Sequence, residues 1–71
     1  MLERKRIGEA LKYYRTRKGL TLEEVGNHFD MTHKAVQFWE NGRTSIKLTI
    51  FVELCKLYDV TPNQVLERAG Y

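Results

Sequence analysis

Residues 19–43 read GLTLEEVGNHFDMTHKAVQFWENGR, and they contain the start and end signals of two helices. Thr21 is followed three positions later by Glu24, which is the capping-box pattern that begins a helix. Thr32 is a second cap residue, with no acidic residue three positions later. Apolar residues repeat at helical spacing after each cap, as they do on the buried side of a helix. The stretch therefore predicts two short helices, near residues 22–29 and 33–41.

Only Asp30, Met31 and Thr32 separate these two helices. Two short helices joined by so short a connection form a helix-turn-helix. Beyond this motif, Thr61 followed by Pro62 signals another helix start, and helix ends are marked by Gly19, Gly42 and Gly70. The pattern predicts an all-α fold, a compact five-helix domain over residues 1–71 with the helix-turn-helix at about 21–41. The predicted helices lie near residues 3–18, 22–29, 33–41, 47–58 and 62–68.

The predicted fourth helix carries an apolar stripe that we expect to face the core, formed by Leu48, Phe51, Val52, Cys55 and Tyr58. On this stripe Cys55 is a small core residue. It is the only cysteine, so no disulfide can form within the chain, and the sequence predicts a cytoplasmic protein.

Composition and motifs exclude several classes of protein. The 71 residues contain no apolar run of membrane-spanning length, and the basic start lacks the apolar stretch of a signal peptide. The chain has no glycine-rich phosphate loop, nucleophile elbow or carboxylate pair in an evident pocket, so we expect no enzyme, cofactor or small-molecule substrate. His28, His33 and Cys55 lack the number and spacing of zinc ligands, so we expect no metal.

Charge is unevenly distributed along the chain. The formal net charge is +3, and seven of the twelve Lys and Arg residues lie within residues 1–18. Such an asymmetry is expected where one side of a protein meets a polyanion. Aromatic residues do not indicate single-stranded nucleic acid, because Tyr13 is expected at the surface and Tyr71 at a terminus, where disorder is common.

From about Ile7 to Leu66 the chain resembles the phage repressor and Cro-like helix-turn-helix family. The resemblance rests on the order and spacing of GLTLEEVG (19–26), Met31-Thr32, Val36, WENGR (39–43) and DVTPNQVL (59–66). It implies binding of double-stranded DNA and an inward salt bridge between Arg15 and Glu40. It also implies phosphate contacts at the end of the third helix and in the next loop, at Asn41, Gly42, Arg43, Thr44, Ser45 and Lys47.

Three positions depart from the pattern of that family. Leu22 stands where the family usually has a glutamine that contacts a phosphate, so we expect one positioning contact to be lost. Gly26 replaces the usual alanine, which costs up to about 1 kcal/mol of helix propensity but still allows close packing. Asp30 occupies a turn position that is often glycine, and aspartate tolerates the left-handed region better than most residues.

The predicted third helix has two unlike faces, since successive residues turn by about 100°. Ala35, Val36 and Trp39 share the side expected to meet the core, and the opposite side of a helix-turn-helix enters the major groove. On that opposite side, Lys34 can donate to guanine and Gln37 can pair with adenine. We therefore predict that the base-reading residues are His33, Lys34, Gln37 and Phe38, and that Thr32 and Asn41 lie among the phosphate contacts.

One reading helix discriminates too little on its own. Each good contact contributes about 1–3 kcal/mol, whereas specific sites exceed non-specific binding by about 4–10 kcal/mol. We therefore expect a homodimer on a two-fold operator. The resemblance places its interface near the loop before the fourth helix and around the fifth, with candidates Ile46, Ile50, Leu57 and Leu66. The sequence thus predicts a transcriptional repressor of prophage, mobile-element or bacterial origin, acting at the nucleoid.

Phe38 leaves two interpretations open, because the family usually has a polar or basic side chain at this position. Its ring can pack on a thymine methyl group. Alternatively, it can join Leu22 in an apolar patch that binds a protein partner. Under the second interpretation the chain is a protein-interaction module, such as an antitoxin or anti-repressor, built on the same fold.

Overall fold

The computed structural model describes residues 1–71 and contains five helices and no strand. The helices are α1 (Arg4–Lys18), α2 (Leu22–His28), α3 (His33–Glu40), α4 (Leu48–Leu57) and α5 (Pro62–Arg68). The predicted all-α, five-helix architecture is confirmed, and every helix boundary lies within one residue of its predicted position. None of the five is long and apolar enough to pass through a lipid bilayer.

Reciprocal side-chain caps determine where α2 and α5 begin. Thr21 Oγ1 accepts a hydrogen bond from the backbone N–H of Glu24 (3.1 Å), and the Glu24 carboxylate accepts one from the Thr21 N–H (2.9 Å). The same two bonds join Thr61 and Gln64, at 3.1 and 2.8 Å. The capping box predicted at Thr21 is present, a second one forms at Thr61, and each cap contributes about 1 kcal/mol to the start of its helix.

The turn between α2 and α3 is tight and depends on its glycine. Asp30 has a φ of 57°, in the left-handed region, and the Met31 N–H donates to the Gly26 carbonyl at 2.8 Å. A Cβ atom at Gly26 would lie 2.7 Å from the Met31 carbonyl oxygen, so alanine does not fit this turn unless the backbone shifts. Thr32 then caps α3 through one bond from the Ala35 N–H, at 3.4 Å.

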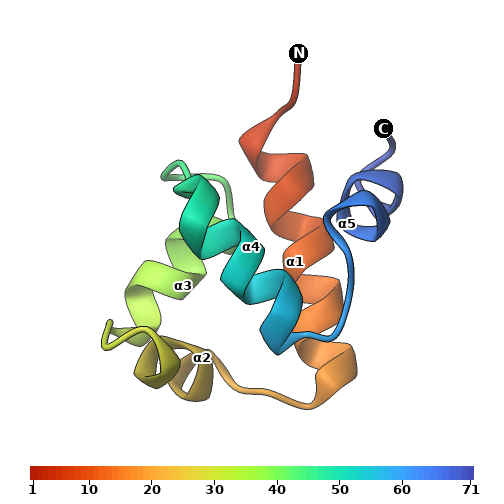
Figure 1. Cartoon of the computed structure of the whole chain (residues 1–71). Coiled ribbons are helices and arrows are strands. Elements are labelled where there is room, and N and C mark those ends of the chain that lie inside the picture. Colours follow the sequence, from red (N-terminus) through yellow and green to blue (C-terminus); the bar gives the residue numbers. More distant parts are fainter.

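α1 runs through the middle of the molecule, and the other helices surround it (Figure 1). It packs against α3 and α5, while α2 packs against α3 and α4 packs against α5. The two chain termini lie at the same end of the molecule. The helix-turn-helix is therefore held against a central helix rather than standing alone.

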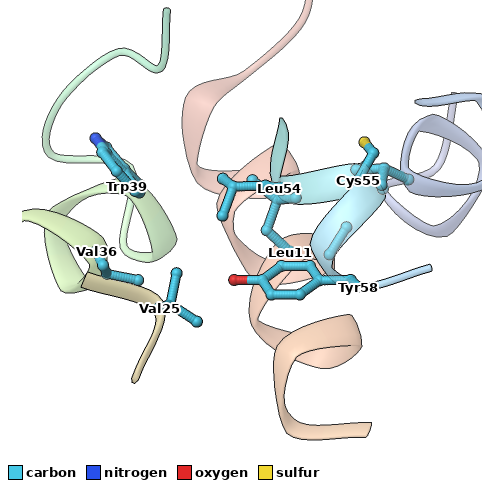
Figure 2. Packing of buried hydrophobic residues seen from close by; sticks show 10 residues of the cluster. Leu11, Val25, Val36, Trp39, Leu54, Cys55 and Tyr58 are labelled. Carbon is cyan, nitrogen blue, oxygen red and sulfur yellow. The ribbon is translucent and has the colours of Figure 1, made fainter. Parts of the chain in front are cut away.

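One hydrophobic core joins all five helices. In Figure 2, Val25 and Val36 of the helix-turn-helix lie opposite Leu11 of α1 and Leu54 of α4. Burying a side chain of this kind contributes about 1.5–3 kcal/mol. The buried apolar residues are Ala10, Leu11, Val25, Val36, Trp39, Leu54, Cys55, Tyr58, Val65 and Ala69.

The buried face of α4 differs from the predicted stripe. Cys55 and Tyr58 are buried as expected, but Leu48 is 75% exposed and Val52 is 36% exposed. Leu54, which the predicted stripe omitted, is buried instead. At about 100° per residue, Leu54 and Tyr58 share one side of the helix, whereas Val52 lies nearly opposite Leu54. Leu48 is the first residue of α4, and its side chain extends past the core.

The last residue, Tyr71, packs against the start of the chain. Its hydroxyl accepts a hydrogen bond from the Glu3 N–H at 2.8 Å. The Arg6 guanidinium lies 4.3 Å from the centroid of its ring and donates to the carbonyls of Ala69 and Gly70. Arg6 therefore joins the two ends of the chain and is not a free charge.

Candidate nucleic-acid interface

The two faces of α3 are divided as its sequence predicts. Val36 and Trp39 are buried and Ala35 is half-buried. The exposed residues on the other side are His33, Lys34 and Gln37. A short helix whose apolar side is fixed in a core presents its polar side in one defined orientation. Three of the four predicted base-reading residues therefore stand in solvent, with Phe38 half-buried beside them.

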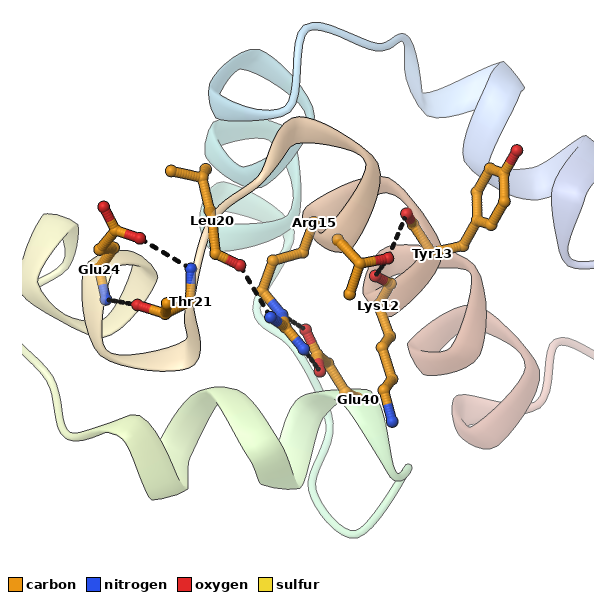
Figure 3. A network of polar contacts seen from close by, with 8 residues as sticks. Lys12, Tyr13, Arg15, Leu20, Thr21, Glu24 and Glu40 are labelled. Carbon is orange, nitrogen blue, oxygen red and sulfur yellow. Dashed lines mark hydrogen bonds and ion pairs between the residues drawn. The ribbon is translucent and has the colours of Figure 1, made fainter.

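A buried ion pair anchors the C-terminal end of α3 to α1 (Figure 3). Arg15 Nε and Nη2 donate to the two carboxylate oxygens of Glu40 at 2.6 and 3.0 Å. Arg15 Nη1 donates to the Leu20 carbonyl at 2.8 Å, at the entrance to α2. The hydrogen bond to Glu40 raises the pKa of the Arg15 guanidinium, outweighing the opposing effect of burial. One guanidinium thus fixes the positions of α1, α2 and α3 together.

Close backbone contact between α1 and α3 accompanies this pair. Gly8 is buried, and a Cβ atom there would collide with the carbonyl groups of Trp39 and Glu40. This role of Gly8 does not follow from the sequence, because a glycine inside a predicted helix carries no local sign of the partner it contacts. Its position one turn before buried Leu11 is the only signal that the sequence offers.

The chain reverses direction immediately after α3. Gly42 has a φ of 77°, and the Arg43 N–H donates to the Phe38 carbonyl at 2.9 Å. The same N–H contacts Asn41 Oδ1 at 3.0 Å, which leaves the amide NH₂ of Asn41 directed elsewhere. Beyond this turn, hydroxyl groups and cations follow one another in the exposed residues Arg43, Thr44, Ser45 and Lys47. The predicted phosphate-contacting residues are thereby brought to one end of α3, except Thr32, which caps the other end.

Phe38 and Leu22 do not stand out as a shared apolar patch. Both side chains are half-buried, and Leu22 packs against the hydrophobic core. Leu22 lines two surface depressions, and Phe38 lines neither of them. The guanidinium carbon of Arg43 instead lies 5.2 Å from the centroid of the Phe38 ring.

Two lysines of α1 that the sequence analysis did not assign lie beside α3. Lys5 and Lys12 line a depression of about 290 Å³ together with Gln37 and Asn41. Figure 3 shows the Lys12 side chain extending from α1 past Glu40 toward the end of α3. The two lysines are seven residues apart, so they share one face of α1, and this spacing was the available signal.

Three of the four candidate dimer residues, Ile46, Ile50 and Leu57, pack against the hydrophobic core. Ile46, Ile50, Leu57 and Leu66 are all half-buried. Ile46 and Leu66 line an apolar depression of about 360 Å³, which also includes Leu2, Ile7, Leu48 and Phe51. Leu2 is 57% exposed and Leu48 75%, so the edge of this depression carries apolar side chains that nothing in the chain covers.

The residues weighed as metal ligands lie apart. His28 Nε2 is 4.0 Å from Glu53 Oε1, and Cys55 lies in the core, where burial raises the pKa of its thiol. His33 lies on the exposed face of α3. No three His, Cys, Asp or Glu side chains gather closely enough to hold a metal ion.

Comparisons with known proteins agree with this geometry. Two crystal structures of the clp gene regulator ClgR from Corynebacterium glutamicum match the chain with a TM-score of 0.89 and 26% sequence identity. Both matches cover 99% of this chain, and they cover 90% and 74% of the respective ClgR chains. No curated protein sequence matches the chain. The family model described as helix-turn-helix matches residues 11–65, so the chain belongs to the helix-turn-helix family of Cro and lambda repressor-like DNA-binding domains.

Proposed function

We propose that the chain regulates transcription by binding double-stranded DNA sequence-specifically, with α3 in the major groove. The observation that carries this proposal is the exposed polar face of α3, formed by His33, Lys34 and Gln37 above a buried apolar side. Lys34 can donate to O6 and N7 of guanine, and Gln37 can pair with N6 and N7 of adenine. The only carboxylate of α3, Glu40, is paired with Arg15 and does not repel DNA.

Phosphate contacts on both sides of α3 orient the helix in the groove. They come from Thr32 at its start and from Asn41, Gly42, Arg43, Thr44, Ser45 and Lys47 at and after its end. Lys5 and Lys12 extend this set, because they share a depression with Gln37 and Asn41 and carry charges that a phosphate backbone would neutralise. Leu22 contributes no such contact, since its side chain has no donor.

Two copies of the chain bind one operator, because a single α3 with two or three readers does not reach the discrimination of a specific site. The apolar depression lined by Ile46 and Leu66 supports this arrangement, since a second copy would remove Leu2 and Leu48 from water. Ile50 and Leu57 lie on α4, the helix that contributes Leu48 and Phe51 to this depression, and complete the proposed interface.

The regulator acts as a repressor. A dimer bound across a promoter occludes it without any further catalytic or effector function. The likeness to ClgR, a regulator of clp genes, supports a role in controlling transcription. The proposed role would be carried out at the bacterial nucleoid.

Selection of binding sites from random duplex DNA near physiological salt tests this function. We expect an enriched two-fold sequence whose affinity for the protein falls steeply as salt is raised. Lys34→Ala should lose the enrichment at one position of each half-site, whereas Lys56→Ala, an exposed lysine on α4, should leave the selected sequence unchanged. Binding without any enriched sequence would contradict the proposal.

A further inference from the structure

We infer that Phe38 is a positioning residue whose ring holds the Arg43 guanidinium beside the end of α3, where it meets a backbone phosphate of the operator. Phe38 is then neither a reader of thymine nor an anchor for a protein partner. The inference rests on the proposed function, because the effect of Phe38 on operator affinity can be measured only if the chain binds DNA. The contact between the two side chains, however, exists in the free protein and can be tested there.

The geometry of the pair is that of a cation over an aromatic face. The Arg43 Cζ atom lies 5.2 Å from the centroid of the Phe38 ring, within the range of about 6 Å over which such contacts attract. Phe38 is half-buried at the end of α3, whereas Arg43 is exposed. The ring is thus partly held in the fold, and the guanidinium of an exposed side chain lies over it.

The backbone of Phe38 also fixes the start of Arg43. The Phe38 carbonyl accepts hydrogen bonds from the N–H groups of Arg43 (2.9 Å) and Thr44 (3.4 Å). Asn41 Oδ1 accepts a third, from the Arg43 N–H at 3.0 Å. One residue therefore holds Arg43 twice, through its carbonyl at the backbone and through its ring at the guanidinium.

Arg43 differs from another stacked arginine of the chain in what its N–H groups do. Arg6 lies over the Tyr71 ring, but its guanidinium donates to the carbonyls of Ala69 and Gly70. Arg43 donates to no side chain or carbonyl through its guanidinium. Stacking leaves the in-plane donors of a guanidinium available for a phosphate, and a side chain that is already oriented loses less freedom on binding.

A double-mutant cycle on the selected operator tests this role. Phe38→Leu should weaken binding by roughly three- to tenfold, in line with loss of a cation–π contact. Arg43→Gln should weaken binding at least as much, and it should lower the slope of log K against log salt by about 0.9, the value for one phosphate contact. Phe38→Leu added to Arg43→Gln should then have no further effect, and Phe38→Tyr, which keeps the ring, should bind like the wild type.

Two further measurements separate the alternatives. If Phe38 packs on a thymine methyl, replacing thymine by uracil in the operator should abolish the effect of Phe38→Leu, and that effect should persist in the Arg43→Gln background. Either result overturns the inference. Equal binding by Phe38→Leu and wild type also overturns it.

The free protein provides a test that does not depend on DNA. The ring current of Phe38 should shift the NMR signals of the Arg43 δ protons, and Phe38→Leu should remove that shift while the thermal unfolding midpoint changes little. Unshifted δ protons in the wild type would overturn the inference. If the wild type selects no operator, the proposed function fails, and the role of Arg43 on DNA fails with it, while the proton shift still decides whether the ring holds the guanidinium.

Discussion

Two surfaces of this molecule are exposed for opposite reasons. Around α3, polar side chains stand in solvent above a framework locked by the Arg15–Glu40 pair. Around the apolar depression, Leu2 and Leu48 stand in solvent because no part of the chain covers them. Exposed polar groups need no cover, whereas clustered exposed apolar groups indicate a partner. The first surface is thus complete in one copy of the chain, and the second is the surface that we propose a second copy covers.

The largest expected effect comes from breaking the framework under the polar surface. Glu40→Ala would leave the Arg15 charge buried without a partner, which costs about 3–5 kcal/mol. Urea unfolding measures this loss as a fall in the free energy of unfolding. Glu67→Ala, at an exposed position on α5, should change it by less than about 0.5 kcal/mol. A loss below about 1 kcal/mol for Glu40→Ala would show that the pair does not anchor α3.

A smaller effect is expected from the close contact between α1 and α3. Gly8→Ala places a methyl group against the carbonyls of Trp39 and Glu40, and such overpacking costs about 1–3 kcal/mol. Alanine has the higher helix propensity, so without that contact the substitution would stabilise α1 by up to about 1 kcal/mol. A lower unfolding midpoint in Gly8→Ala would therefore support the close contact, and a higher midpoint would contradict it. Glu9→Ala, at an exposed neighbouring position, is the control.

A substitution on the apolar surface should weaken the association of two copies rather than the folding of one. Leu48→Ser should weaken cooperative binding of two copies to the operator by roughly tenfold, as expected from losing about 1.4 kcal/mol of apolar burial. The stability of the single copy should change little, because Leu48 is 75% exposed in it. Operator titration followed by sedimentation measures both the affinity and the stoichiometry. Unchanged cooperativity would remove this depression from the dimer interface.

The smallest expected effect comes from the edge of the polar surface. Lys12→Gln should reduce operator affinity only a few-fold and lower the slope of log K against log salt by about 0.9, the value for one phosphate contact. The loss should be the same on operator and random duplex, since a phosphate contact carries no sequence information. Lys56→Gln should leave the slope unaltered, and an equal change in both variants would contradict a specific contact at Lys12.

The sequence predicts well those features that depend on residues close to one another in the chain. Thr21 with Glu24 and Thr61 with Gln64 are local patterns, and both form the bonds that begin α2 and α5. The division of α3 into two faces also follows from spacing alone, because Ala35, Val36 and Trp39 lie together on one side of the helix.

What the sequence leaves undetermined depends on residues far apart in the chain. α4 is apolar on most of its surface, so periodicity could not separate buried Leu54 from exposed Leu48. Gly8 has its partners 31 and 32 positions away, at Trp39 and Glu40. The stacking of Arg43 on Phe38 requires the reversal at Gly42, which shows in the sequence only as a helix end.

The central claim is that the exposed face of α3 reads bases, and the specificity ratio tests it most directly. This ratio compares affinity for the selected operator with affinity for random duplex in the same salt. In the double variant Lys34→Ala, Gln37→Ala we expect the ratio to fall by at least about tenfold for each side chain. Random-duplex affinity and the unfolding midpoint should fall little. An unchanged ratio in a folded double variant would contradict the claim and place sequence recognition elsewhere on the molecule.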